Sequence, residues 1–348
     1  MERLVDPANE LIAILPIDFR EYAQSFDLTN LIEIVADYDR PLELRFPDRF
    51  ERSNLTITDS DIRHILNHQD LTRFGTDNRA GIKGTLHRVS RILDRNEEVV
   101  GLTMRCGRII ENSIELIADL LDSGEGVLFI GAPGTGKTSI IRQACRYLSD
   151  AAEKRVVIVD TSMEIGGDGK VPHKAVGSSR RMPVKQRNQQ YDTMVEGVQN
   201  HFPEVLVVDE IGTQQEAQAC CMIAERGMQL IASIHGKSLE SVINTPKLRD
   251  ILGRVDSAAV SDKNAEKSGE KFVTRRLNEP AFGIAVEVLG FGKLAIHRDV
   301  KRSVDAYLSG ETLRPEQRWL SDGGEVLHRD EMFGDSPLRD LSRFSARE

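Results

Sequence analysis

Residues 126–141 read GVLFIGAPGTGKTSII, and this stretch decides the fold. Residues 126–130 form a short, continuous apolar run of the kind that is buried inside a parallel sheet. Residues 139–148 have the pattern of a helix, and residues 131–138 between them fit GxxxxGK[ST]. Strand, loop and helix therefore follow one another in the order that a phosphate-binding loop requires.

The loop predicts a nucleotide site with defined roles for its residues. Its glycines let successive backbone N–H groups turn inward around a β-phosphate, helped by the positive end of the following helix. We expect Lys137 to reach the β- and γ-phosphates and the Thr138 hydroxyl to coordinate magnesium. The predicted ligands are therefore ATP and Mg²⁺. The predicted nucleotide-binding residues are Gly131, Ala132, Pro133, Gly134, Thr135, Gly136, Lys137, Thr138 and Ser139.

Further buried strands are indicated outward from this loop. Residues 155–160, 204–209 and 229–234 are apolar runs separated by helical or loop stretches. This alternation is typical of an α/β fold with an open, mostly parallel sheet. Residues 271–276 and 284–289 are expected to add an antiparallel extension.

Polar residues at the ends of these strands are the candidate catalytic groups. Asp209 ends one strand, where a carboxylate can hold magnesium through water, and Glu210 is the expected base that polarises the attacking water. Glu164, which follows the strand at residues 155–160, competes for that role or assists it. His235 closes the next strand and is either a sensor of the γ-phosphate or a structural histidine.

Residues 169–187 form a basic stretch without an acidic residue. One interpretation is a solvated loop. A second makes Arg180 or Arg181 an arginine finger that reaches the γ-phosphate of a neighbouring subunit. A third makes the stretch a contact for a nucleic-acid backbone. The same question applies to the basic residues of the first segment, Arg73, Arg79, Lys83, Arg88 and Arg91.

The chain divides into three predicted segments. Residues 1–105 form a small α+β domain, with helical spacing at 28–37 and a hairpin at 85–93 and 99–105. Residues 106–300 form the ATPase domain, which begins with an amphipathic helix at 109–121. Residues 301–348 are a helix followed by a polar, partly disordered tail.

Bulk properties limit the classes of function. The formal net charge of −9 argues against a general nucleic-acid coat protein but allows local basic patches. The four cysteines lack metal-ligand spacing and are interpreted as reduced and buried. No apolar run approaches the roughly 18 residues of a membrane span, and residues 1–16 do not resemble a signal peptide. These features favour a reducing, aqueous compartment such as the cytoplasm.

The chain also resembles a known family. The resemblance lies in FGTDNRAGIKGTLHRVSRI (74–92), GLTMRCGR (101–108), GAPGTGKTS (131–139), VVIVDTSMEIGGDGKVPHKAVGSSRRM (156–182), PEVLVVDEIGT (203–213), AERGMQLIASIHG (224–236) and FGIAVEV (282–288). These stretches are similar to the P-loop ATPases of cyanobacteria and plastids related to stage III sporulation protein AA. That group is itself similar to the hexameric secretion and pilus-retraction ATPases.

The resemblance implies a RecA-like (AAA/RecA-like) P-loop core, a homo-oligomer that tends to form a ring, and a histidine near the γ-phosphate at position 235. The expected activity is hydrolysis of ATP to ADP and phosphate, coupled to single-stranded nucleic acid or DNA. There are two alternatives to an ATPase that acts on nucleic acid. One is a protein-remodelling or assembly motor, and the other is a nucleotide-dependent switch with little turnover. Longer members carry a C-terminal nucleic-acid-binding domain with an Arg-x-x-x-His signature. The sequence up to Glu348 does not show that signature, which weakens the expectation of nucleic-acid binding.

Overall fold

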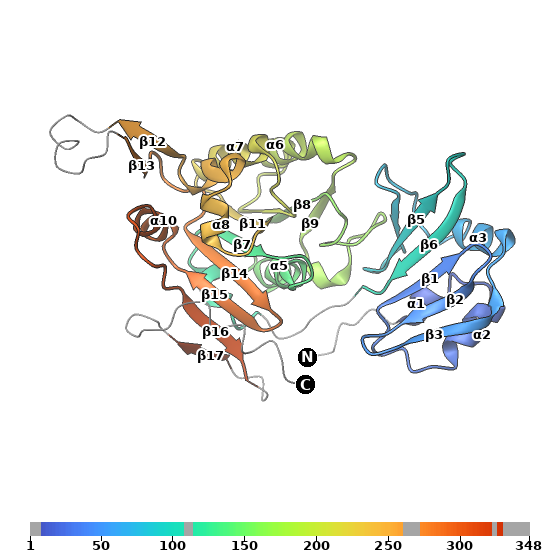
Figure 1. The fold of residues 1–348 in the computed structure, drawn as a ribbon. Helices are drawn as coiled ribbons and strands as arrows, with labels where there is room; N and C mark the ends of the chain where they lie inside the picture. Colours follow the sequence, from blue (N-terminus) through green and yellow to red (C-terminus); the bar gives the residue numbers. More distant parts are fainter. Residues whose placement is uncertain (1–7, 108–113, 260–271, 322–325, 330–348) are drawn as a thin grey trace.

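The computed structural model describes residues 8–107, 114–259, 272–321 and 326–329 of the 348-residue chain. Figure 1 shows a larger part, in which helices surround a long sheet, and a smaller part drawn in blue to teal. Residues 330–348 and 109–113 lie outside the described residues. The expected disorder of the tail and the first half of the helix expected at 109–121 therefore fall outside them.

The smaller part is an antiparallel sheet with three short helices. Its six strands run in the order β3-β2-β1-β6-β5-β4, and all pairs are antiparallel. Leu11, Phe19, Ile34 and Met104 are among its fully or almost fully buried side chains. The elements are α1 (Ala8–Ile12), α2 (Ile17–Gln24), β1 (Glu33–Asp37), β2 (Pro41–Arg45), β3 (Phe50–Thr56), α3 (Asp59–Leu66), β4 (Arg79–Gly81), β5 (Arg88–Leu93) and β6 (Val99–Arg105).

The helical spacing noted at 28–37 was the wrong period. Residues Glu33–Asp37 form strand β1, in which Ile34 and Ala36 are buried and their neighbours are half-buried. β1 pairs with β2 on one side and β6 on the other. Pairing on both sides, with the neighbouring strand β2 and with the distant strand β6, overrides the local helical pattern.

The larger part is built on a nine-stranded sheet of order β17-β16-β15-β14-β7-β11-β10-β8-β9. The six strands from β14 to β9 are parallel, and β15, β16 and β17 continue the sheet in antiparallel fashion. The strands are β7 (Val127–Gly131), β8 (Val156–Asp160), β9 (Arg180–Pro183), β10 (Val205–Val208), β11 (Gln229–His235), β14 (Ile284–Gly290), β15 (Lys293–His297), β16 (Glu316–Leu320) and β17 (Val326–Arg329).

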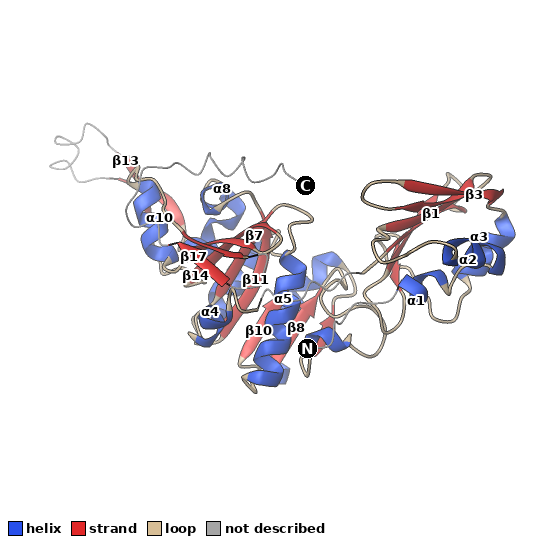
Figure 2. Cartoon of the chain, turned by 90° about the horizontal axis from the view of Figure 1, so that it is seen from below, coloured by secondary structure: helices blue, strands red, loops and turns tan. Residues whose placement is uncertain are grey.

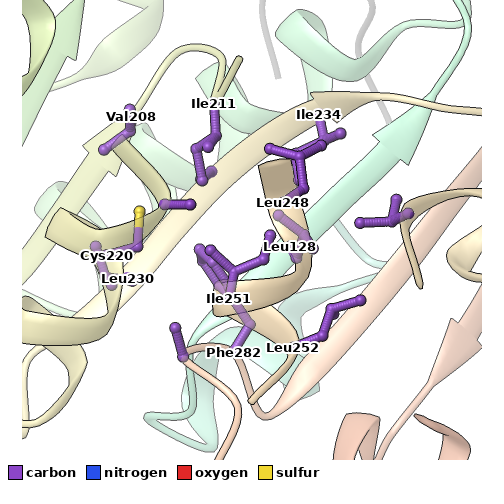
Figure 3. Close-up of a cluster of buried hydrophobic side chains, with 14 of the residues drawn as sticks. Leu128, Val208, Ile211, Cys220, Leu230, Ile234, Leu248, Ile251, Leu252 and Phe282 are labelled. Carbon is purple, nitrogen blue, oxygen red and sulfur yellow. The ribbon is translucent and has the colours of Figure 1, made fainter. Parts of the chain in front are cut away.

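Helices cover both faces of this sheet, so the central strands are apolar on both sides. Leu128 and Ile130 of β7 point to the core under α6, α7, α8 and α10, whereas Val127 and Phe129 point to the core under α4 and α5. Figure 2 shows α5 lying across one face of the strands, and Figure 3 shows part of the core on the other face. The helices are α4 (Ala118–Asp122), α5 (Lys137–Arg146), α6 (Gln190–His201), α7 (Gln214–Ala224), α8 (Leu239–Ile243) and α10 (Val300–Leu308).

Three expectations for this part need correction. The helix expected up to residue 121 is, within the described residues, the single short helix α4. β14 pairs in parallel with β7, so the antiparallel extension begins at β15 and not at residue 284. β13 (Phe272–Arg276), expected in the same extension, instead pairs with β12 (Val255–Ala259) in a separate two-stranded sheet.

The expected boundary at residue 300 divides elements of one sheet. β16 and β17 follow α10 in the sequence, and β16 pairs with β15. Arg318 on β16 holds the strand in place, because its guanidinium bonds to the Leu116 carbonyl oxygen at 2.6 Å and to both carboxylate oxygens of Asp119. The nine-stranded sheet therefore extends to Arg329.

Two bulk expectations can be compared with the structure. Among the described residues, no helix is long and apolar enough to cross a membrane. The four cysteines are free thiols: Cys145 and Cys220 are buried, and Cys106 and Cys221 are half-buried. The pKa values of Cys145 and Cys220 are raised by burial.

Candidate functional site

The candidate residues gather where four neighbouring parallel strands end. β7 leads into the glycine-rich loop, β11 ends at His235, β10 is followed by Asp209 and Glu210, and β8 ends at Asp160. The register places His235 opposite Gly131. Because the carboxyl ends of parallel strands share one edge of a sheet, these groups form a single site.

The loop of residues 131–138 has the backbone of a ligand cradle. Gly134 and Gly136 have φ values of 79° and 100°, which an L side chain adopts only with strain. Apart from the adjoining residues, no atom lies within 4 Å of the position that a Cβ would take at either glycine. α5 begins directly afterwards, at Lys137, so its positive end faces this open space. The loop therefore suits a phosphate group.

The Lys137 ammonium lies folded back on its own loop. Its Nζ donates to the carbonyl oxygens of Gly131 at 2.7 Å and Ala132 at 2.9 Å. The residue is only 7% exposed. Burial lowers its pKa, and the nearby carboxylates of Glu210, Glu164 and Asp209 partly counteract this. Lys137 is therefore a desolvated cation with acidic groups nearby.

His235 connects Lys137 with Glu210. Its Nδ1 is 3.4 Å from Lys137 Nζ, and its Nε2 is 3.2 Å from Glu210 Oε2. The partners fit a neutral ring that carries its proton on Nε2, because that nitrogen then donates to the carboxylate and Nδ1 accepts from the ammonium. The histidine therefore lies between the lysine of the phosphate loop and the expected catalytic carboxylate.

Two residues that sequence reasoning did not single out position Glu210. Gln190, which is buried at the start of α6, donates from Nε2 to the Glu210 carbonyl oxygen at 2.7 Å and accepts a bond from Thr161. Arg187 Nη2 is 3.5 Å from Glu210 Oε1. Arg187 lies in the basic stretch, but Gln190 had no signal, because a glutamine at the start of a helix is usually a surface residue.

Asp209 is held by the loop that follows β8. Its Oδ2 accepts from the Ser162 amide at 3.0 Å and also from the Ser162 hydroxyl. Burial raises the pKa of Asp209, and it does the same for the neighbouring Asp160. Both bonds that Asp209 accepts from described residues go to Oδ2, which leaves Oδ1 available to a ligand.

The donor set fits magnesium better than a metal held by the protein alone. Among the residues that the structure describes, no group of three or more histidine, cysteine, aspartate or glutamate side chains could hold a metal. Mg²⁺ is usually bound through one or two carboxylates together with water and substrate phosphates. One carboxylate (Asp209) and one hydroxyl at the start of α5 (Thr138) match that requirement.

Glu164 faces the N-terminal part of the chain. Its carboxylate forms an ion pair with Arg88 of β5. Its carbonyl oxygen accepts from Arg142 Nη2 of α5 at 2.6 Å, and the next carbonyl oxygen accepts from Arg142 Nε at 2.9 Å. Glu164 is therefore fixed between the two parts, whereas Glu210 lies beside His235 and Lys137.

A second contact joins the loop that follows β8 to the N-terminal sheet. Asp168 Oδ2 accepts from the Gly81 amide at 3.1 Å and from the Thr72 hydroxyl. A Cβ on Gly81 would lie 2.4 Å from that of Asp168, and one on Gly167 would lie 2.6 Å from the Thr85 carbonyl oxygen. Both glycines occur in the stretches that carry the family resemblance.

A basic cavity lies between the two parts. Its volume is about 580 Å³, within the usual range for ligand clefts. Thr138, Ser162 and Glu164 reach its wall from the catalytic edge. Basic side chains outnumber acidic ones in its lining. They are Arg73, Arg79, Arg88, Arg105, Arg142, Lys185 and Arg187, against Asp77, Glu164 and Asp168.

The two finger candidates have different surroundings. Arg181 donates from Nη1 to the carbonyl oxygen of Gly166 at 3.2 Å, and also to the carbonyl oxygens of Gly167 and Gly169. Its guanidinium thus holds the loop that carries Asp168. Arg180, its neighbour on the edge strand β9, is exposed. Arg180 is therefore the exposed member of the pair, and Arg181 is the one held by its own chain.

Replacing Arg181 by alanine is expected to lower the free energy of unfolding by about 1–3 kcal/mol, because carbonyl groups that it satisfies lose their donor. Arg180→Ala should leave the free energy of unfolding unchanged, because the Arg180 side chain is exposed. Urea unfolding of the two single variants checks this. Equal destabilisation by both changes would contradict the assignment of Arg181 as a structural group.

Comparison with known proteins supports the fold and identifies relatives. The family described as "Sporulation stage III, protein AA" matches residues 87–270, just over half of the chain. The chain is 42% identical to the uncharacterized protein ycf45 of Porphyra purpurea over 93% of its own length and 58% of that protein's. It is 37% identical to ycf45 of Cyanidium caldarium, of which it covers 96%.

Two more comparisons add a plant protein and a solved structure. The chain is 40% identical to Protein SEEDLING PLASTID DEVELOPMENT 1 of Arabidopsis thaliana, over 93% of its own length and 48% of that protein's. It therefore spans about half the length of the Porphyra and Arabidopsis relatives. The crystal structure of the pilus retraction motor PilT with bound ADP has a TM-score of 0.54 at 13% identity and covers 82% of this chain and 85% of its own. This likeness shows that the chain shares the α/β fold of that motor.

Proposed function

Because the chain belongs to the stage III sporulation protein AA family and has the fold of a P-loop ATPase, we propose that it binds ATP with Mg²⁺ and hydrolyses it to ADP and phosphate. One observation carries the proposal. Lys137, His235 and Glu210 form a continuous chain of contacts at the mouth of the glycine-rich loop. A phosphate-binding cation and a carboxylate that can act as a base thus lie on two sides of one imidazole.

The residues have distinct roles in the proposed reaction. Backbone N–H groups of the loop and Lys137 bind the phosphates and balance the charge that develops on the transferred group. Glu210 orients a water molecule and accepts its proton as the oxygen attacks the γ-phosphorus. Mg²⁺, held by Thr138 and Asp209, would neutralise charge on the phosphate oxygens. His235 is in position to respond to the loss of the γ-phosphate, because it contacts both Lys137 and Glu210.

Steady-state release of phosphate from ATP tests the proposal. We expect turnover in the presence of Mg²⁺. The rate should fall to that of buffer without protein when EDTA removes the metal, and it should recover when Mg²⁺ is restored. Asp209→Asn should need a higher Mg²⁺ concentration for half-maximal turnover, because it removes the carboxylate charge at the metal site. Phosphate release that continues unchanged in EDTA would contradict a magnesium-dependent ATPase.

The basic cavity favours nucleic acid as the polymer on which the ATPase acts. An excess of arginine and lysine beside the catalytic edge suits a phosphate backbone. We expect single-stranded DNA or RNA to raise turnover several-fold at low salt, less so as salt increases. Turnover indifferent to single-stranded DNA, duplex DNA and RNA would reject this partner and favour the alternative, a protein-remodelling or assembly motor.

Assembly and location are part of the same proposal. A homo-oligomeric ring would bring the exposed Arg180 of the edge strand β9 toward a neighbouring subunit. Analytical ultracentrifugation with and without ATP tests assembly. The name of the Arabidopsis relative refers to plastid development, which supports the plastid stroma as the location, with the cytoplasm as the alternative.

A further inference from the structure

An exposed aromatic ring stands beside the phosphate loop at the tip of the β14–β15 hairpin. Phe291 is 64% exposed, whereas Phe129 and Phe282 of the same part are fully buried. The neighbouring strand β16 holds the tip in place, because the Gly292 carbonyl oxygen accepts a hydrogen bond from the Leu320 amide at 3.0 Å. Leu320 also packs against Gly292. The ring is therefore presented to solvent by a supported turn.

The surface between this ring and the loop is a shallow hollow. Its walls come from the loop and the start of α5 on one side and from the hairpin on the other. Its volume is about 20 Å³, close to that of one water molecule, so a larger ligand would lie over it and against the ring. The lining includes Thr135, Gly136, Ser139, Val288, Phe291 and Leu294.

The strand order gives the direction in which a bound nucleotide would run. β11 and β10, which carry His235, Asp209 and Glu210, lie on one side of β7. β14, which leads to Phe291, lies on the other side. A γ-phosphate that faces Glu210 leaves the nucleoside end of the molecule on the side of the hairpin.

We propose that Phe291 is the platform on which the base of the bound nucleotide stacks, and that it favours purine over pyrimidine triphosphates. The inference rests on the proposed ATP site and adds a base subsite to it. Stacking on an aromatic face is sequence-tolerant and grows with the area of the rings in contact. The hollow is lined by apolar side chains and two hydroxyl-bearing residues, Thr135 and Ser139. The subsite therefore selects the size of the base more than its hydrogen-bonding pattern.

Binding of ATP, UTP and inorganic tripolyphosphate, each with Mg²⁺, separates the base from the phosphates. Phe291→Ala should weaken ATP binding by about tenfold, a loss in the usual range for one base–aromatic stack. It should leave tripolyphosphate binding unchanged and reduce the preference for ATP over UTP. Phe50→Ala is the matched control, because Phe50 is also exposed, at 56%, but lies on β3 of the N-terminal sheet.

A fluorescence measurement tests the contact itself. Trp319 is the only tryptophan of the chain, so Phe291→Trp in a Trp319→Phe background places one reporter at the hairpin tip. ATP should quench its emission and tripolyphosphate should not.

Two outcomes would overturn the subsite: equal loss of ATP and tripolyphosphate binding in Phe291→Ala, or unchanged ATP binding together with no quenching. Failure of the ATP site itself has a different signature. In that case the wild-type chain binds neither ATP nor tripolyphosphate, or the Lys137→Ala variant binds both as tightly as the wild-type chain does.

Discussion

Replacing Glu210 by glutamine is expected to lower kcat for ATP hydrolysis by about 100-fold or more while ATP still binds. Glutamine keeps the size of the side chain but cannot accept a proton from water. It can still bond to His235, which lies 3.2 Å from the carboxylate. The loss should therefore appear in kcat, with little change in the Kd for ATP.

The matched control is Glu164→Gln, the change at the competing carboxylate. Glu164 is paired with Arg88 of the N-terminal sheet, so its replacement should weaken the contact between the two parts more than the chemical step. We expect a loss of turnover well below that of Glu210→Gln and similar to that of Arg88→Ala. Single-turnover hydrolysis measured beside equilibrium ATP binding checks both variants. A larger loss in Glu164→Gln would exchange the roles of the two glutamates.

Local sequence patterns predicted the elements of the catalytic edge well. The four strands β7, β8, β10 and β11 were expected within one or two residues of their observed bounds. Each is a mainly apolar run, and such a run is stable only when it is buried on both faces. The glycine-rich loop was found for a similar reason, because the positive φ values of Gly134 and Gly136 restrict the residue type directly.

Contacts between distant segments were less accessible to sequence reasoning. Arg180 and Arg181 are identical neighbours in the sequence, yet Arg181 binds loop carbonyl groups whereas Arg180 is exposed. Residues 284–289 became a parallel strand because β7, more than 150 residues earlier, supplies the partner. Neither outcome follows from periodicity, since both depend on which segments the fold brings together.

Replacing Lys137 by alanine is expected to weaken ATP binding by at least about 100-fold, because it removes a charge-assisted donor to the phosphates from a desolvated position. The same change should barely alter the folded protein without nucleotide. Burial already lowers the pKa of Lys137, so removal of the ammonium also removes a cost of desolvation. That gain offsets part of the loss of its bonds to the Gly131 and Ala132 carbonyl oxygens.

Thermal unfolding with and without Mg–ATP separates these two effects. At a free ATP concentration 100 times its Kd, the wild-type chain should gain about 2.7 kcal/mol of stability, and Lys137→Ala should gain almost none. Lys154→Ala is the control, because Lys154 makes its own bond to Gln229 at 3.0 Å, at the opposite ends of the strands. It should keep the full gain. An equal gain in Lys137→Ala would mean that ATP does not bind at the glycine-rich loop.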